Sequence, residues 1–156
     1  FCQNGAYNET FGGGKMNIDS IKNGIVIDHI SAGNGMKLYE LLGLSDLDAS
    51  VAIIKNAQSS KLSKKDIIKI DADIKIDLDV IGYVDPDATV NIIKDGNRVD
   101  KFSVKAPRLL KNVIRCKNPR CITSTEQGLD RVFRLTDEQK KIYRCIYCDA
   151  KYGSSD

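Results

Sequence analysis

The sequence CKNPRC at residues 116–121 and the sequence CIYC at residues 145–148 decide how the C-terminal part of this chain folds. Together they form the pattern C-x4-C, twenty-three intervening residues, and C-x2-C. Two short loops of this kind present four thiolates to one tetrahedral ion, with metal–sulfur bonds of about 2.3 Å. The pattern predicts one Zn2+ per chain, bound by Cys116, Cys121, Cys145 and Cys148.

Four protein thiolates leave no coordination position for a water molecule, so such a zinc site is structural and not catalytic. Two alternatives use the same cysteines. Two disulfides would need an oxidising compartment, and the first residues do not resemble a secretory signal peptide. A single iron bound by four thiolates, as in rubredoxin, has the same geometry. The negative charge of either metal cluster suits the neighbouring cations, which are Arg115, Lys117, Arg120 and Arg144.

The composition is that of a soluble globular protein, with 156 residues of which 42% are hydrophobic. This length allows one medium domain or two small ones. No apolar run approaches the ~20 residues that cross a bilayer. We therefore expect a cytoplasmic protein without membrane contact.

The overall charge of +3 conceals two different halves. Residues 16–104 contain 11 Lys and Arg against 14 Asp and Glu, whereas residues 105–156 contain 12 against 6. The cysteines lie in the basic half. A basic zinc module is typical of proteins that bind either nucleic acid or an acidic protein surface.

The chain divides into three segments by composition. Residues 1–15, FCQNGAYNETFGGGK, end in a glycine-rich linker, and we interpret them as a tag, a linker or an extension. Residues 16–106 are predicted to form one domain. Pro107 and a cluster of basic residues mark the boundary to a second domain of residues 107–156, which is small enough to need a metal for stability.

The first domain starts with a predicted strand, a turn at Asn23-Gly24 and a second strand. In IVIDHI, at residues 25–30, alternation puts Ile25, Ile27 and His29 on one face and Val26, Asp28 and Ile30 on the other.

Residues 35–44 have the three-to-four spacing of an amphipathic helix, with Asn34 and Gly43 as its predicted caps. A strand at residues 51–54 and an exposed polar loop at residues 58–65 follow.

Residues 68–80, IKIDADIKIDLDV, alternate like one long strand, or else break near residues 71–73 before a short helix. Asp95-Gly96 between β-branched residues predicts a hairpin. The element order predicts an α+β fold with helices on one face of an antiparallel sheet. Residues 132–135 and 142–143 suggest short strands in an all-β zinc domain.

Several motifs in this order resemble the regulatory chain of aspartate carbamoyltransferase. They are GIVIDHI at residues 24–30, KKDIIKI at residues 64–70, PDATVNII at residues 86–93 and the four cysteines, and the likeness covers residues 16–152. The resemblance implies a ferredoxin-like allosteric domain that binds nucleoside triphosphates. It also implies a zinc domain that docks on catalytic chains, and regulatory dimers that bridge catalytic trimers. It favours the strand-then-helix interpretation of residues 68–80.

The resemblance further implies a nucleotide-binding set, carried over position by position. This set consists of Ile18, Asp19, Ser20, Ile21, Asp28, His29, Lys69, Asn91, Ile93 and Lys101. ATP, CTP and UTP are the effectors that it implies. The chain departs from the family at Gly96 and Arg98, which replace larger or apolar pocket residues, and at Arg120, where an asparagine is familiar.

Two other functions use some of the same residues. A zinc-ribbon protein could bind nucleic acid through the four cations near the cysteines and through Tyr143, Tyr147 and Tyr152. That hypothesis does not explain the acidic first domain. A small enzyme of nucleotide metabolism is the third possibility, but one histidine, committed cysteines and scattered carboxylates do not form a catalytic set. We expect a non-catalytic regulatory subunit.

Overall fold

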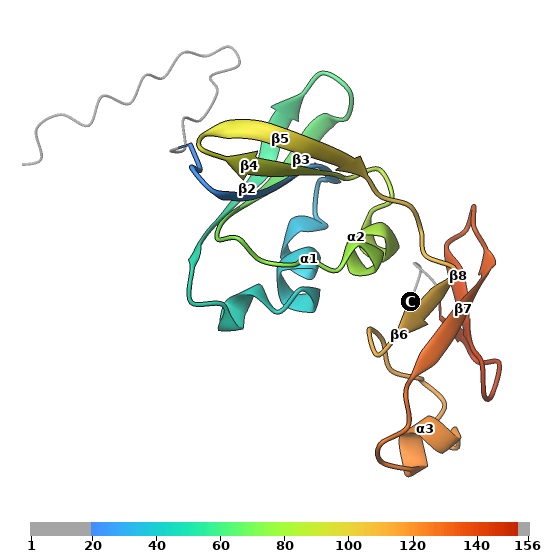
Figure 1. The fold of residues 1–156 in the computed structure, drawn as a ribbon. Helices are drawn as coiled ribbons and strands as arrows, with labels where there is room; N and C mark the ends of the chain where they lie inside the picture. Colours follow the sequence, from blue (N-terminus) through green and yellow to red (C-terminus); the bar gives the residue numbers. More distant parts are fainter. Residues whose placement is uncertain (1–19, 153–156) are drawn as a thin grey trace, which may run out of the picture.

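The computed structural model describes residues 20–152, which form two β-sheets with separate buried cores (Figure 1). The N-terminal sheet and its helices comprise β1 (Gly24–Ser31), α1 (Gly35–Leu41), the 3-10 helix η1 (Leu44–Asp46), β2 (Ser50–Ser59), β3 (Ser63–Asp71), α2 (Leu78–Val84), β4 (Thr89–Lys94) and β5 (Asn97–Ser103). The C-terminal sheet comprises β6 (Leu109–Lys111), β7 (Val132–Asp137), β8 (Ile142–Cys145) and β9 (Lys151–Tyr152), with the short helix α3 (Ile122–Thr125) beside it.

The strands of the N-terminal sheet lie in the order β2-β3-β1-β4-β5, and every neighbouring pair is antiparallel. The succession β1-α1-β2-β3-α2-β4, with β1 and β3 in the centre, is the ferredoxin-like arrangement. Figure 1 shows α1 and α2 on the same side of this sheet. The predicted α+β fold, with helices on one face and a small all-β domain after it, is confirmed.

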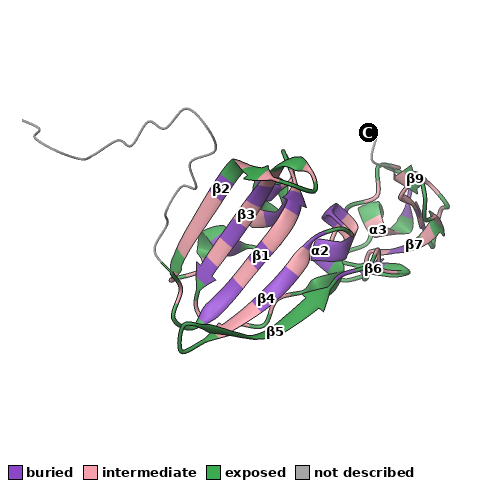
Figure 2. Ribbon diagram, turned by 90° about the horizontal axis from the view of Figure 1, so that it is seen from above, coloured by how far each residue is buried: buried purple, intermediate pink, exposed green. Residues whose placement is uncertain are grey.

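The N-terminal core lies between the sheet and the two helices. Alternate residues of the central strands point into it, among them Ile25, Ile27, Ile68, Ile70 and Val90, and they meet Leu38 from α1 and Ile81 and Val84 from α2. Each fully buried side chain of this size contributes about 1.5 to 3 kcal/mol through the hydrophobic effect. The residues between them point to the opposite face, which we call the open face because neither α1 nor α2 covers it (Figure 2).

A β-bulge interrupts β1 between Ile27 and Ile30, with His29 at φ 57°. The extra residue reverses the alternation, so Ile30 is fully buried opposite Asp66 on the core side. The prediction that His29 shares a face with Ile25 and Ile27 while Ile30 faces away is therefore wrong. The period-two count missed the bulge.

No strand precedes Gly24 in the described residues 20–23. The Lys22 carbonyl instead accepts a hydrogen bond of 2.9 Å from Gly96 N–H, and the Asn23 side chain accepts one of 3.1 Å from Asp95 N–H. This segment thus binds the tip of the β4–β5 hairpin. Gly24 is needed for close approach, since a Cβ atom there would lie 2.0 Å from the Ile70 carbonyl oxygen.

The helix predicted for residues 35–44 is present as α1, followed by a left-handed Gly43 at φ 65°. Asn34 occupies the N-cap position, but its side chain makes no capping hydrogen bond. The predicted loop at residues 58–65 is mostly strand, because β2 extends to Ser59 and β3 begins at Ser63.

The interpretation of residues 68–80 as a strand followed by a helix is confirmed, because β3 ends at Asp71 and α2 begins at Leu78. The Asp77 side chain caps α2 by accepting from the N–H groups of Asp79 and Val80. The predicted hairpin at Asp95-Gly96 is confirmed too, with both residues at positive φ as a type I′ turn requires.

Two buried carboxylates hold α1 and α2 against the sheet. Asp66 on β3 accepts backbone hydrogen bonds from Gly33, Gly35 and Asn56 at 3.0 to 3.1 Å. Asp85, directly after α2, accepts one from Ser31 at the end of β1 at 2.5 Å.

Among the described residues, no helix is long and apolar enough to cross a membrane.

Candidate functional site: a four-cysteine metal centre and the open face of the sheet

The four predicted metal ligands meet at one point in the C-terminal domain. The sulfur atoms of Cys116, Cys121, Cys145 and Cys148 all lie within 4.8 Å of one another. Cys116 and Cys148 are 3.5 Å apart, and Cys121 and Cys145 are 3.7 Å apart. A tetrahedral ion with metal–sulfur bonds of about 2.3 Å needs sulfur–sulfur separations of roughly 3.8 Å. The cluster therefore fits Zn2+.

The same distances exclude disulfides among these four residues, because a disulfide bond is about 2.05 Å long. Tight turns hold each cysteine pair in place. The backbone N–H of Cys121 donates to Asn118 O at 3.1 Å, and that of Asp149 donates to Cys145 O at 2.9 Å. Strand β8 delivers Cys145 to the centre, so the sheet and the metal site are one structural unit.

The protein environment shifts the pKa values of two of these thiols in opposite directions. The Thr123 hydroxyl, 3.1 Å from the Cys121 sulfur, lowers the pKa of that thiol to about 7. Burial raises the pKa of the Cys116 thiol to about 12. A bound dication favours the thiolate form of all four ligands, so metal binding releases protons from this site.

The basic residues around the cysteines are not all available to a partner. Arg144 donates to the Asp149 carbonyl at 3.1 Å, and Lys117 lies 4.7 Å above the Tyr152 ring. Tyr143, a predicted stacking residue, is fully buried in the C-terminal core. Because these groups already have partners within the chain, the nucleic-acid-binding alternative is not favoured.

The second predicted site lies on the open face of the N-terminal sheet. Strand register aligns four residues directly across it, with Lys69 on β3 opposite Val26 on β1, Val26 opposite Asn91 on β4, and Asn91 opposite Lys101 on β5. We call this set the cross-strand row. Neighbouring strands are about 4.8 Å apart, so the Lys69 and Lys101 backbones are roughly 14 Å apart. Both long side chains can reach a ligand that lies over β1 and β4.

The Asn91 side chain carries an unpaired polar atom. Its residue is only 9% exposed, and its amide nitrogen donates to the Val26 carbonyl at 3.4 Å. Its side-chain oxygen is buried without a hydrogen-bond partner among the described residues. An unpaired buried acceptor costs about 1 to 3 kcal/mol, so a hydrogen-bond donor that reaches this oxygen would remove that cost.

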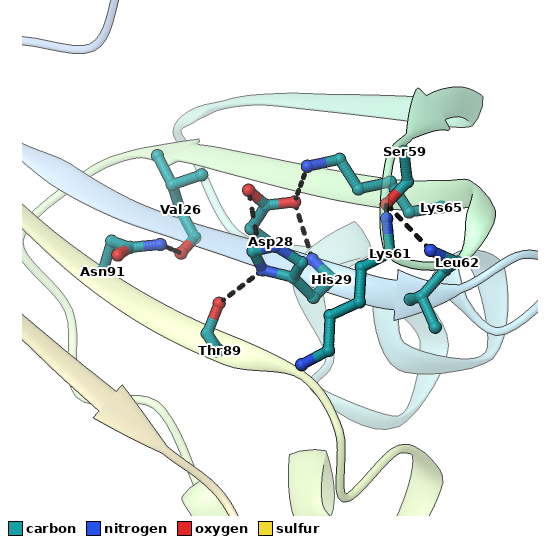
Figure 3. Close-up of polar contacts among 9 residues, drawn as sticks. All are labelled: Val26, Asp28, His29, Ser59, Lys61, Leu62, Lys65, Thr89 and Asn91. Carbon is teal, nitrogen blue, oxygen red and sulfur yellow. Dashed lines mark hydrogen bonds and ion pairs between the residues drawn. The ribbon is translucent and has the colours of Figure 1, made fainter.

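Asp28, two residues along β1 from Val26, and His29 make a compact polar group with Lys65 and Thr89 beside the row (Figure 3). Asp28 pairs with Lys65 at 2.9 Å and accepts from His29 N–H at 2.6 Å. The His29 ring nitrogen Nδ1 is 3.0 Å from the Thr89 hydroxyl. Lys65 and Thr89 are not among the residues that the sequence predicted for this site. Period two from Lys69 in KKDIIKI places Lys65 on the same face, which is the signal that could have identified it.

The other predicted nucleotide-binding residues lie outside the cross-strand row and the polar group. Ile93 lies on the open face opposite Gly24, two residues along β4 from Asn91. Ser20 is exposed and Ile21 is half-buried ahead of β1. Ile18 and Asp19 lie outside the described residues.

Comparison with known proteins gives the same family for both parts of the chain. Residues 16–105 match the model of the aspartate carbamoyltransferase regulatory chain, allosteric domain, and residues 108–156 match that of its metal binding domain. The aspartate carbamoyltransferase regulatory chain of Clostridium botulinum is 50% identical over 141 residues, which cover 90% of this chain and 97% of the relative.

Two further relatives agree. The regulatory chain of Clostridium tetani is 51% identical over 138 residues, covering 88% of this chain and 96% of the relative. That of Bifidobacterium longum is 43% identical over 134 residues, covering 86% and 96%. With its ferredoxin-like sheet and four-cysteine metal centre, this chain belongs to the family of aspartate carbamoyltransferase regulatory chains.

Proposed function

We propose that this chain is a non-catalytic subunit that binds nucleoside triphosphates on the open face and passes their effect to the catalytic chains of aspartate carbamoyltransferase. The observation that carries the proposal is the cross-strand row, in which two lysines flank an apolar residue and a buried asparagine with an unpaired acceptor. A triphosphate needs cations, whereas a base needs an apolar surface and a few directed polar groups.

Lys69 and Lys101 supply positive charge at the two sides of the row, and Lys65 adds a third cation next to Asp28. Asn91 offers its free oxygen to a donor, such as the exocyclic amino group of adenine or cytosine. These groups support ATP and CTP as ligands. UTP lacks that amino group, and its uracil N3–H is the donor that could meet the same oxygen. The remaining proposed contacts are Ser20, Ile21, Asp28, His29 and Ile93, together with Ile18 and Asp19 outside the described residues.

The polar group around His29 supports a binding role and not a catalytic one. A catalytic triad uses both ring nitrogens of its histidine, one for the carboxylate and one for the nucleophile. Here the same nitrogen, Nδ1, faces both the Asp28 carboxylate at 3.8 Å and the Thr89 hydroxyl at 3.0 Å. The chain also lacks a Gly-x-x-x-x-Gly-Lys-Ser/Thr loop, so hydrolysis of the nucleotide is not part of the proposal.

The metal centre supports a docking role for the second domain, which we place at residues 107–156 after an allosteric domain of residues 16–106. A closed four-thiolate site is structural, and the turns that it fixes expose Ile146 and Tyr147, which are 47% and 45% accessible. We infer that this domain attaches the chain to a catalytic chain, and that two regulatory chains associate as a dimer in the cytoplasm.

Assembly with the catalytic chain from the same organism tests this function. The two chains are co-expressed, and the complex is sized by light scattering and assayed for its response to aspartate with and without ATP or CTP. The proposal predicts one large complex whose half-saturating aspartate concentration shifts with nucleotide. Cys145→Ser should prevent assembly, whereas the matched variant Cys2→Ser should assemble normally. Chains that remain separate, or a complex that ignores all nucleotides, would refute it.

A further inference from the structure

Strand β5 contains a β-bulge that places a second cation, Arg98, on the open face. In the pairing of β5 with β4, Lys101 lies opposite Asn91 and Arg98 lies opposite Ile93. The register shift between these two pairs leaves Val99 as an extra residue. Residues three apart on a regular strand point to opposite faces, but an extra residue reverses the alternation. Arg98 and Lys101 therefore both accompany open-face residues of β4.

The surface beside Arg98 is apolar. Its partner Ile93 is paired on the other side with Gly24, which has no side chain. A Cβ atom at Gly24 would lie 2.9 Å from Ile21 Cγ2, so the Ile21 side chain lies next to this position. Ile21 and Ile93 are both half-buried. Together they offer the kind of apolar surface on which a base packs.

The position of Arg98 separates it from the cations of the polar group. Along β1, Gly24 and Asp28 lie two residues on either side of Val26, so Arg98 and the polar group flank the cross-strand row from opposite sides. Lys65 at the polar side is already paired with Asp28 at 2.9 Å. The Arg98 side chain is exposed and has no hydrogen-bond or ion-pair partner within residues 20–152.

We propose that Arg98 determines base specificity on the open face, by donating hydrogen bonds to the carbonyl oxygen of a pyrimidine base and so favouring CTP and UTP over ATP. The inference rests on the proposed nucleotide-binding function and adds a residue that reads the base. The base lies at the apolar end of the face, beside Ile21 and Ile93, and the phosphates lie toward Lys101 and the polar group.

The chemistry of the base edges explains the preference. Asn91 and Arg98 are diagonal neighbours on adjacent strands, about 7 to 8 Å apart, so one base edge can meet both side chains. Asn91 presents an unpaired acceptor, whereas a guanidinium group only donates. When the cytosine amino group meets Asn91, its N3 and O2 atoms remain as two adjacent acceptors for the planar fork of Arg98.

The other two bases differ at that edge. Uracil can place its N3–H at Asn91 and keeps the O2 carbonyl for Arg98. Adenine that places its amino group at Asn91 offers N1 and then a C2–H group, which accepts no hydrogen bond. A bidentate contact with Arg98 is therefore open to cytosine and closed to adenine.

Calorimetric titration of the full chain with CTP, UTP, ATP and inorganic tripolyphosphate tests this role. Arg98→Ala should weaken CTP and UTP binding by about 5- to 20-fold, the lower part of the range for a base contact, because the guanidinium group is exposed. ATP and tripolyphosphate should change by less than about twofold. Arg98→Lys keeps the charge without the planar fork and should lose most of the pyrimidine preference too.

Lys94→Ala is the matched control, since it removes an exposed cation from the neighbouring strand, next to Ile93 and therefore on the other face. It should bind all four ligands like wild type. Unchanged CTP binding in Arg98→Ala would overturn the proposal. An equal loss for CTP, ATP and tripolyphosphate would also overturn it, because Arg98 would then contact the phosphates. If the wild-type chain binds no nucleotide, the proposed function itself fails, which the wild-type titration alone reveals.

A second measurement tests the single atom that Arg98 is proposed to read. In 2-thiocytidine triphosphate a sulfur atom, which is a weak acceptor, replaces the O2 oxygen. The wild-type chain should bind it about 5- to 20-fold more weakly than CTP, whereas Arg98→Ala should bind the two alike. A wild-type chain that binds both equally, or an undiminished difference in Arg98→Ala, would contradict the assignment.

Discussion

Asp28 on β1 and Lys65 on β3 form an ion pair of 2.9 Å in which the two side chains are only 23% and 17% exposed. The same carboxylate accepts the His29 N–H, so it fixes both the bulge and the lysine. The pair lies on the face that we assign to nucleotide binding. Asp28 therefore holds the Lys65 ammonium group in place on that face.

Replacing this carboxylate should weaken the sheet. Asp28→Asn leaves Lys65 without its counter-charge and should lower the free energy of unfolding by about 1.5 to 3 kcal/mol, the value of a charge-assisted hydrogen bond. The matched variant Asp48→Asn, at an exposed position, should change it by less than about 0.5 kcal/mol. Urea unfolding followed by circular dichroism measures both. Equal midpoints for the two variants would show that the pair has no structural role.

Asp66 should be more critical than Asp28. It is fully buried and accepts three backbone N–H groups, which Asp66→Ala would leave unpaired. Each buried donor left unpaired costs about 1 to 3 kcal/mol, so the unfolding free energy of the N-terminal domain should fall by roughly 3 kcal/mol or more. The domain should then unfold at a much lower urea concentration. Asp66→Asn keeps one acceptor oxygen and should lose less. A small or equal loss in both variants would contradict this explanation of how α1 is attached.

Metal removal should unfold one domain and spare the other. Structural zinc in small modules contributes on the order of 10 kcal/mol of apparent binding free energy. A chelator should therefore abolish amide protection in β7 and β8, and leave β1 and β3 protected. Elemental analysis of the untreated protein should find one zinc per chain. Protein that contains neither zinc nor iron, or β7 and β8 amides that stay protected after chelation, would contradict the assignment.

Tyr83 and Tyr143, whose rings meet edge to face between the two domains, should make the protein sensitive to alkali. Burial, with the neighbouring Tyr152 as a smaller cause, raises the pKa of Tyr83 to about 12. Burial, with Tyr83 among the smaller causes, raises the pKa of Tyr143 to about 12. The ordinary pKa of tyrosine is about 10, so the folded state favours the neutral rings. Their stabilising effect is complete below about pH 10 and is lost as pH rises through about 12.

Unfolding at increasing pH, followed together with tyrosinate absorbance, checks this sign. Tyr83→Phe and Tyr143→Phe should shift the alkaline loss of structure to higher pH, because phenylalanine does not ionise. Tyr147→Phe, at an exposed position, serves as the control and should leave it unchanged. An alkaline transition that none of the three substitutions moves would mean that other groups cause it.

The sequence allowed prediction of those features that depend on local pattern. Asp95-Gly96 predicted a hairpin because both positions need positive φ, and the structure has that hairpin. The four cysteines predicted a cluster because their spacing alone forms two metal-binding turns. Lys69, Asn91 and Lys101 were suggested by family resemblance, and the register that aligns them depends on pairing between strands far apart in sequence.

Features set by distant contacts were missed. The bulge at His29 accompanies a hydrogen bond to Thr89 and the placement of Ile30 opposite Asp66, neither of which is visible in the local alternation. The segment before Gly24 had the composition of a strand, but it binds the hairpin tip across the sheet. The contact of Tyr83 with Tyr143 was not predicted, because the two residues are 60 positions apart and lie in different domains.

The central claim, that the open face binds nucleoside triphosphates, is tested most directly by calorimetric titration of ATP and CTP into the full chain. Wild type should bind both, and Lys101→Ala should bind them about ten- to a hundredfold more weakly, since a charge-assisted contact contributes roughly 1.5 to 3 kcal/mol. Lys94→Ala, at the end of β4 and beyond the cross-strand row, is the matched control and should bind like wild type. If Lys101→Ala binds both nucleotides as tightly as wild type, the site is not on this face.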